Sequence, residues 1–183
     1  GWKDKDKNGI REKVINGETV ELEFSIIYNQ GHLIREKMAS ALKEALKKIG
    51  VNVIVEAQDF PTVLDNVRKK DFDSYSLGWV TPTGMDDLAQ LWHSESGIEY
   101  GSNRTGFKSP ECDQLIDQLK ECLDPEEREK LYKEIQLLIV KEQHYVFLFI
   151  PNQLTIIRKG FEDPKSVSQR PGYTPHVFKK KAN

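Results

Sequence analysis

The sequence predicts an α/β fold with a mixed, mostly parallel sheet flanked by helices. Three segments, 20–28, 51–57 and 73–80, carry the alternating or continuous apolar pattern of β-strands. Apolar residues recur at helical spacing between them, over 33–49 and again over 61–70. Strands that alternate with helices at such short intervals pair in parallel, and the helices then cover the faces of the sheet.

Local signals support these boundaries. Asn16-Gly17 is a strong turn signal ahead of the first strand, and Asn29-Gln30-Gly31 forms a loop at its carboxyl end. Gly50 suits the residue that follows a helix, and Pro61 suits the first turn of the next one. The order is therefore strand, helix, strand, helix, strand.

The second half of the chain predicts more helix. A short helix is expected over 85–92, followed by a long ordered loop to Lys108. Ser109-Pro110-Glu111 and Asp124-Pro125-Glu126 both have the pattern of a helix start, with a capping side chain, proline and an acid. The second of these helices is expected to run to Glu142.

The last part of the chain changes character. The run 145–150 is the most apolar of the sequence and predicts a buried strand, with a further strand over 153–158. From residue 159 the periodicity stops, and three prolines and a run of lysines follow. Such a tail is either disordered or shaped to pack on another surface.

Composition excludes several classes of protein. The 183 residues suit one domain, and 27 basic against 29 acidic residues give a net charge of −2, which does not favour nucleic acid. No stretch is long enough to cross a membrane. The start at Gly1 shows no signal peptide, which taken alone indicates a cytosolic protein, although a fragment of a secreted protein would look the same.

The cysteines and histidines predict neither a disulfide nor zinc. Cys112 and Cys122 fall on one predicted helix, about 15 Å apart along its axis. The four histidines are scattered, so no zinc-ligand spacing is present.

A loop near the start carries the beginning of a calcium-loop pattern. Its first, third, fifth and sixth positions are Asp4, Asp6, Asn8 and Gly9. The twelfth position, normally a bidentate glutamate, is Ile15, and Glu12 stands at the ninth. A turn closed by side-chain hydrogen bonds is the favoured interpretation, so no metal is predicted, and calcium remains the alternative.

No residue set predicts catalysis or a bound cofactor. Asp86-Asp87 is an acid pair, but neighbours on a helix point about 100° apart, which is poor geometry for shared acid–base work. His93 lies at a helix end, where a solvated or dipole-paired histidine is expected.

The stretch Gly78-Trp79 is the candidate ligand-facing element. In open α/β sheets, ligands bind beyond the carboxyl ends of the strands. Gly78 permits a close approach to the backbone, and Trp79 offers a flat apolar wall with one hydrogen-bond donor. A core position for Trp79 is the alternative.

Several short motifs together resemble the extracellular solute-binding proteins of family 5, the dipeptide/oligopeptide type that feeds ABC importers. The motifs are Gly1–Ile10, Leu46–Val51, Asp71–Asp73, Gly78-Trp79, Gly106–Glu111 and Asp124–Glu126, followed by the apolar run ending in Pro151. Their order and spacing cover about 160 residues, and the resemblance is to the C-terminal lobe of the family.

The resemblance implies a type II periplasmic-binding-protein-like lobe over 1–158 and a tail, 159–183, that packs on an N-terminal lobe of the same parent chain. It also implies a peptide or small-molecule ligand, an ABC transporter permease as partner, and a periplasmic or extracellular protein, with or without a lipid anchor, that is not an enzyme. A ligand-sensing module for signalling is the alternative. The expected ligand-binding residues are Tyr28, Asn29, Gln30, Gly78, Trp79, Thr81, Pro82, Thr83 and Asp86.

One position departs from the family. Peptide-binding members place an aspartate three residues after the Gly-Trp tryptophan, where it holds the ammonium group of the peptide, and here that position is Pro82. A buried peptide terminus without a counter-charge is costly. A neutral ligand, a longer peptide held by its backbone, or a charge from the other lobe all remain open.

Overall fold

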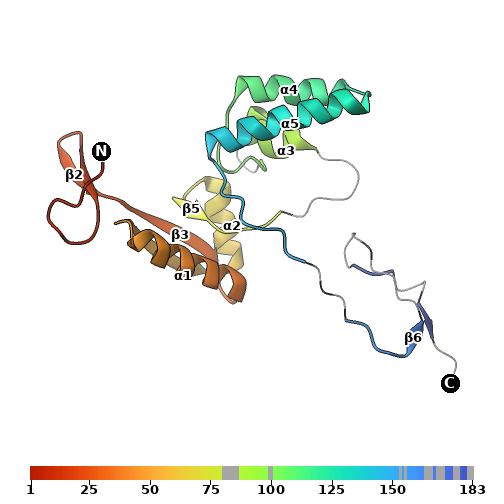
Figure 1. Cartoon of the computed structure of the whole chain (residues 1–183), viewed down its shortest axis with the longest axis horizontal. Coiled ribbons are helices and arrows are strands. Elements are labelled where there is room, and N and C mark those ends of the chain that lie inside the picture. Colours follow the sequence, from red (N-terminus) through yellow and green to blue (C-terminus); the bar gives the residue numbers. More distant parts are fainter. Residues whose placement is uncertain are drawn as a thin grey trace.

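The computed structural model describes residues 1–79, 87–98, 101–152, 154, 156–162, 167, 172–174 and 178–180. In chain order its elements are β1 (Glu12–Ile15), β2 (Glu18–Glu21), β3 (Glu23–Asn29), α1 (Leu33–Lys47), β4 (Asn52–Gln58), α2 (Phe60–Lys69), β5 (Ser74–Tyr75), α3 (Leu88–Trp92), the 3-10 helix η1 (Ser94–Gly97), α4 (Pro110–Glu121), α5 (Pro125–Glu142), β6 (Phe161–Glu162) and β7 (Lys179–Lys180) (Figure 1).

The centre of the first half is a three-stranded parallel sheet in the order β4-β3-β5. Its main register pairs Glu23 with Asn52 and continues to Asn29 opposite Gln58. This confirms the predicted strand–helix–strand unit and its parallel pairing.

Helices cover both faces of this sheet. Successive strand residues point to opposite faces, so β3 contributes to two separate cores. On one face the buried residues of the β3, β4 and α1 cluster are Ile26, Tyr28, Ala39, Val51 and Val53. On the other face Ile27 packs against Val63 and Val67 of α2.

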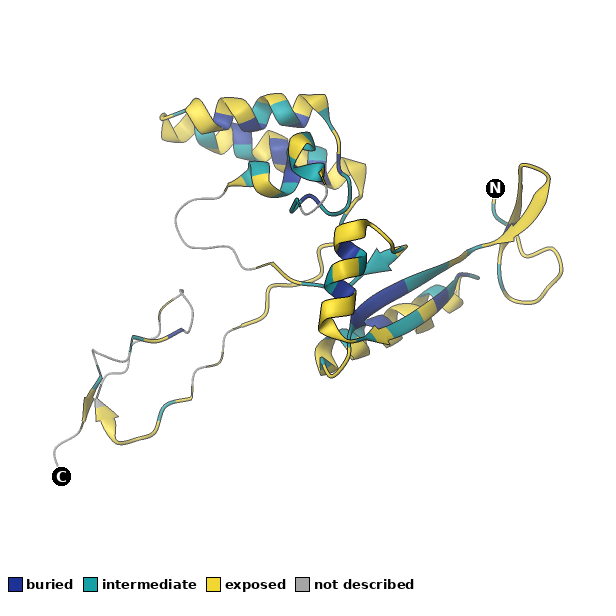
Figure 2. Cartoon of the chain, turned by 180° about the vertical axis from the view of Figure 1, so that it is seen from behind, coloured by how far each residue is buried: buried dark blue, intermediate teal, exposed yellow. Residues whose placement is uncertain are grey.

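The helices α3, α4 and α5 form a second packed unit, which lies to one side of the sheet (Figure 1). Its core includes the fully buried Phe107, whose ring meets Trp92 edge to face. The predicted helix starts are confirmed, because the side chains of Ser109 and Asp124 accept hydrogen bonds from the backbone N–H groups of Cys112 and Glu127. Figure 2 shows the buried positions facing inward between the helices.

The predicted strand over 20–28 is two strands in two different sheets. The chain turns at Asn16-Gly17, where both residues have positive φ, and β1 and β2 pair as an antiparallel hairpin. At Leu22 the chain leaves this hairpin, and its N–H donates to the carbonyl of Arg11. The apolar alternation runs through this break unchanged, which is why the pattern did not reveal it.

The strand predicted over 73–80 is shorter than expected. Only Ser74 and Tyr75 are in strand β5, and the described residues after them leave the ladder at Ser76, whose N–H donates to the carbonyl of Ile27. Val80 lies outside the described residues.

The buried strand predicted over 145–150 is wrong. The side chains from Val146 to Ile150 are 56% to 94% exposed, and no strand pairs with them in the described chain. The described residues of the expected strand over 153–158 are not in a strand either. The tail beyond residue 158 includes one short antiparallel pair, β6 with β7.

Two further expectations concern cysteines and membranes. Cys112 and Cys122 are both free thiols, and burial raises the pKa of Cys112 to about 11. None of the helices in the described residues has the length and apolar character needed to span a bilayer.

Candidate functional site

The carboxyl ends of the three parallel strands meet at one edge of the sheet. There β3 ends at Asn29, β4 ends at Gln58, and the chain after β5 continues to Trp79. The Gln30 N–H donates to the Gln58 carbonyl at 2.7 Å, so the pairing of β3 and β4 extends one step beyond the strands. This is the edge at which open α/β sheets bind ligands.

Amide side chains at this edge are held by the covering helices. The Asn29 side-chain oxygen accepts a hydrogen bond from the guanidinium of Arg35 on α1. The Gln58 side-chain oxygen accepts one from the Asn66 amide on α2, at 3.0 Å. Because neighbours fix their orientation, these amides offer polar groups in defined positions.

Trp79 follows β5 in the chain and is about half exposed. Its exposed fraction is 47%, so it is not a core residue in the described chain. Gly78 next to it is exposed, and no atom lies within 4 Å of the place that a Cβ would occupy. The two residues together present an open backbone and an aromatic face to the surroundings.

The other expected ligand-binding residues divide into three groups. Asn29 and the exposed Gln30 lie at the edge. Tyr28 is only 6% exposed and packs in the core under α1, so its side chain supports the edge from within the sheet. The remaining positions, Thr81, Pro82, Thr83 and Asp86, lie outside the described residues.

The structure also brings together a buried polar cluster that sequence reasoning missed. The hydroxyls of Tyr75 and Tyr145 and one guanidinium nitrogen of Arg104 are buried, and none of them makes a hydrogen bond of ordinary geometry in the described chain. Burial raises the pKa of Tyr75 well above its ordinary value, the Tyr145 hydroxyl adds to this, and Arg104 opposes it. Unpaired buried polar groups of this kind are costly unless water or a ligand satisfies them.

No sequence pattern could have revealed this cluster. Tyr75 comes from β5, Arg104 from the loop before α4, and Tyr145 from the segment after α5. Only the packing of the helical unit beside the sheet places the three near one another.

His93 is mostly shielded from solvent, with 11% of its side chain exposed. Its Nδ1 accepts a hydrogen bond from the Glu95 N–H at 3.2 Å, and its Nε2 lies 3.7 Å from the Asp117 carboxylate. The imidazole therefore joins the start of η1 to α4, which is a structural use of the side chain.

Comparison with known proteins adds three findings. The model described as "Bacterial extracellular solute-binding proteins, family 5 Middle" matches residues 1–101. The oligopeptide-binding protein AppA of Bacillus subtilis is 31% identical over 175 residues, which cover 94% of this chain and 31% of AppA. The periplasmic oligopeptide-binding protein OppA of Salmonella typhimurium is 29% identical over 151 residues, covering 79% of this chain and 27% of OppA.

Two solved structures of oligopeptide-binding proteins are also similar to this chain. Bacillus subtilis AppA in complex with a nonapeptide superposes with a TM-score of 0.84 at 29% identity, covering all of this chain and 35% of AppA. An oligopeptide-binding protein from Thermus thermophilus complexed with a pentapeptide has a TM-score of 0.79 at 23% identity, covering 94% of this chain and 31% of that one. These matches confirm the expected fold of a type II binding-protein lobe. The chain spans about a third of the length of the relatives it matches.

Proposed function

Because the chain belongs to family 5 of the bacterial extracellular solute-binding proteins, we propose that it is one lobe of the substrate-binding component of an ABC importer, and that this component captures peptides. The half-exposed Trp79 at the carboxyl edge of the parallel sheet carries the proposal. An apolar wall at this edge suits a ligand held between two lobes.

In this proposal residues 1–158 form the C-terminal lobe and 159–183 pack on an N-terminal lobe of the same parent chain. The two lobes close around the ligand by hinge motion, and a permease then receives it. The protein acts in the periplasm or outside the cell, with or without a lipid anchor. It captures its ligand and does not transform it, and it needs no cofactor.

The ligand contacts are assigned to the edge. Trp79 packs against the ligand, and Gly78 lets the ligand backbone come close. Asn29, Gln30, the loop Thr81–Thr83 and Asp86 supply polar groups. Since Pro82 brings no counter-charge for an ammonium group, the peptide is held here by its backbone, and its terminus is bound by the other lobe.

The direct test is native mass spectrometry of the intact protein purified without denaturant. A ladder of bound masses spaced by amino-acid residues is the expected result. A single bound mass that is not a peptide would contradict peptide capture while leaving solute capture in place. Purification of Trp79→Ala should give the same protein without the ladder, and Trp79→Phe serves as its matched control.

Signalling is the second candidate, since a ligand-binding lobe can also feed a signalling partner. The parent gene distinguishes the two uses. A reading frame that continues into a transmembrane segment and a cytoplasmic domain would favour signalling over import.

A further inference from the structure

The loop before β1 encloses a buried carboxylate that is only half satisfied. Glu12 is 7% exposed. Its Oε1 accepts a hydrogen bond from the Lys5 N–H at 2.9 Å. Its Oε2 is buried and has no hydrogen-bond partner in the described chain. An ionised oxygen in this position is costly unless a cation or a donor reaches it.

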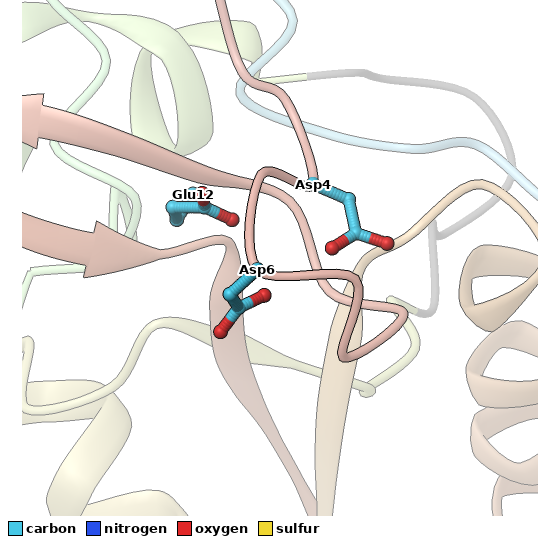
Figure 3. Close-up of side chains that lie close together, drawn as sticks. All are labelled: Asp4, Asp6 and Glu12. Carbon is cyan, nitrogen blue, oxygen red and sulfur yellow. The ribbon is translucent and has the colours of Figure 1, made fainter.

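Two more carboxylates converge on the same point. One carboxylate oxygen from each of Asp4, Asp6 and Glu12 lies within 4.8 Å of the other two. Figure 3 shows the three side chains around one turn of the loop, with Asp4 and Asp6 on the loop and Glu12 at the start of β1. Within the described ranges no lysine, arginine or histidine forms an ion pair with any of them.

We propose that this loop binds one calcium ion through Asp4, Asp6 and Glu12. Two oxygens on one calcium ion lie at most about 5 Å apart, since each Ca–O distance is about 2.4 Å. The observed separations satisfy this limit for each pair of oxygens. The ion neutralises the three carboxylates and gives the buried Oε2 of Glu12 the partner that the chain does not provide.

The backbone geometry explains why the usual twelfth ligand is missing. Gly9 has φ +92°, the turn that such a loop requires at its sixth position. The chain then enters β1 at Glu12, so the twelfth residue, Ile15, lies on the strand and is 41% exposed. The ninth residue, Glu12, is the one that turns inward and supplies the missing charge.

A turn closed only by side-chain hydrogen bonds does not account for Glu12. Such bonds are present, since Asp6 accepts from the Asn8 N–H and Asp4 accepts from the Gly9 N–H, both at 3.1 Å. They leave further lone pairs free on each carboxylate, because an ionised carboxyl can accept about four. They do not reach Oε2 of Glu12.

Oxygen ligands of this kind select hard cations. Calcium accepts six to eight oxygens in flexible geometry, whereas magnesium requires a near-ideal octahedron and dehydrates reluctantly. An irregular loop that offers three carboxylates therefore fits calcium better than magnesium.

The bound ion would stabilise the contacts of this loop with the rest of the lobe. Arg11, next to Glu12, donates its N–H to the carbonyl of Gly50 at 2.8 Å, just before β4. Glu12 also pairs with Lys3 through two backbone hydrogen bonds. An ion that orders the loop of Asp4 and Asp6 would therefore also stabilise the β1–β2 hairpin and its contact with the start of the parallel sheet.

Calorimetric titration of the full chain with calcium chloride, after removal of metal with EGTA, tests the proposal. One site per chain is expected, with a dissociation constant of roughly 10⁻⁴ to 10⁻³ M, as in extracellular calcium modules. Glu12→Gln and Asp6→Asn should each weaken binding at least about tenfold, because affinity follows the charge of the ligand set. Glu18→Gln, on the exposed strand β2 of the same hairpin, should leave it unchanged.

Thermal melting separates binding from a purely structural role of Glu12. Calcium should raise the melting temperature of the wild type and of Glu18→Gln. In EGTA, Glu12→Gln should melt at or above the wild type, because it removes the unpaired buried charge, and calcium should no longer shift it. No heat and no shift for the wild type, wild-type calcium affinity in Glu12→Gln, or magnesium binding as tight as calcium would each overturn the proposal.

Discussion

At the scale of single residues, Trp79 has the exposure of a binding residue and the size of an anchor. The residue is 47% exposed in this chain, so closure of a second lobe over a ligand would bury it further. Aromatic anchors that become fully buried dominate binding energies. In the intact protein Trp79→Ala should weaken peptide binding about tenfold or more, which is about 1.4 kcal/mol or above.

Isothermal titration with a peptide recovered from the purified protein measures this effect. Trp79→Phe keeps the aromatic wall and should lose much less. If Trp79→Ala binds as well as the wild type but melts at a lower temperature, the ring belongs to the protein core and not to the site.

Burial of Tyr75 predicts that the protein loses stability at alkaline pH. Burial holds the pKa of Tyr75 above its ordinary value, so the unfolded chain gives up this proton first as the pH rises. The contribution of Tyr75 to the free energy of unfolding is complete below the pKa that it has in the unfolded chain. It is lost progressively as the pH rises from there towards the raised pKa of the folded state. Stability should therefore fall by up to about 1.4 kcal/mol per pH unit above a pH of about 10.

Urea unfolding at several pH values, compared between the wild type and Tyr75→Phe, isolates this effect. The variant should lose less stability above a pH of about 10, where the phenol begins to ionise. Tyr173→Phe, at an exposed position, should behave like the wild type. Parallel pH profiles for the wild type and Tyr75→Phe would show that the Tyr75 hydroxyl is satisfied and does not control the loss.

At the scale of elements, the start of α5 depends on one side chain. Asp124 accepts a hydrogen bond from the Glu127 N–H at 2.9 Å, and its charge lies at the positive end of the helix. Asp124→Ala should lower the free energy of unfolding by about 1 kcal/mol, as for other N-cap losses. Chemical denaturation measures it, and Glu134→Gln in the middle of the same helix should change little. Equal effects of the two substitutions would contradict a capping role.

The elements also show how far the sequence could predict this fold. Helix starts at Ser109 and Asp124 were predictable because a helix cap is local chemistry. The break at Leu22 was not, because the alternation of apolar residues continues through it while the pairing partner changes from β1 to β4. A strand also needs another strand to pair with, and the sequence pattern does not show whether the run 145–150 has such a partner.

The candidate site was predictable to a similar extent. The rule that ligands bind at strand ends locates Asn29, Gln30 and Trp79, since strand ends can be read from the pattern. It does not tell how deeply a residue near a strand end is buried, and Tyr28 packs in the core under α1. The buried carboxylate of Glu12 depends on the three-dimensional course of the loop, which spacing alone cannot give.

At the scale of the molecule, the apolar segment 146–150 is left uncovered by the described part of this chain. Its side chains are more than half exposed in this chain, and the relatives are about three times longer. We expect the rest of the parent protein to bury it. Its backbone amides should exchange with solvent on the order of 100-fold more slowly in the intact protein than in the 183-residue chain.

Hydrogen–deuterium exchange on both forms makes the comparison. Amides of α4, which is packed within this chain, should exchange at the same rate in the two and serve as the internal control. Equal fast exchange of residues 146–150 in the two forms would mean that no other part of the protein covers this segment.

The carboxylates of Asp4, Asp6 and Glu12 also bear on when and where the lobe becomes fully ordered. The calcium ion proposed for this loop would relieve the repulsion between its three like charges, so the loop would be more ordered where calcium is abundant than where it is scarce. Calcium is scarce inside a cell and abundant outside it. A lobe that binds calcium in this loop would therefore be less ordered there before export and more ordered after it.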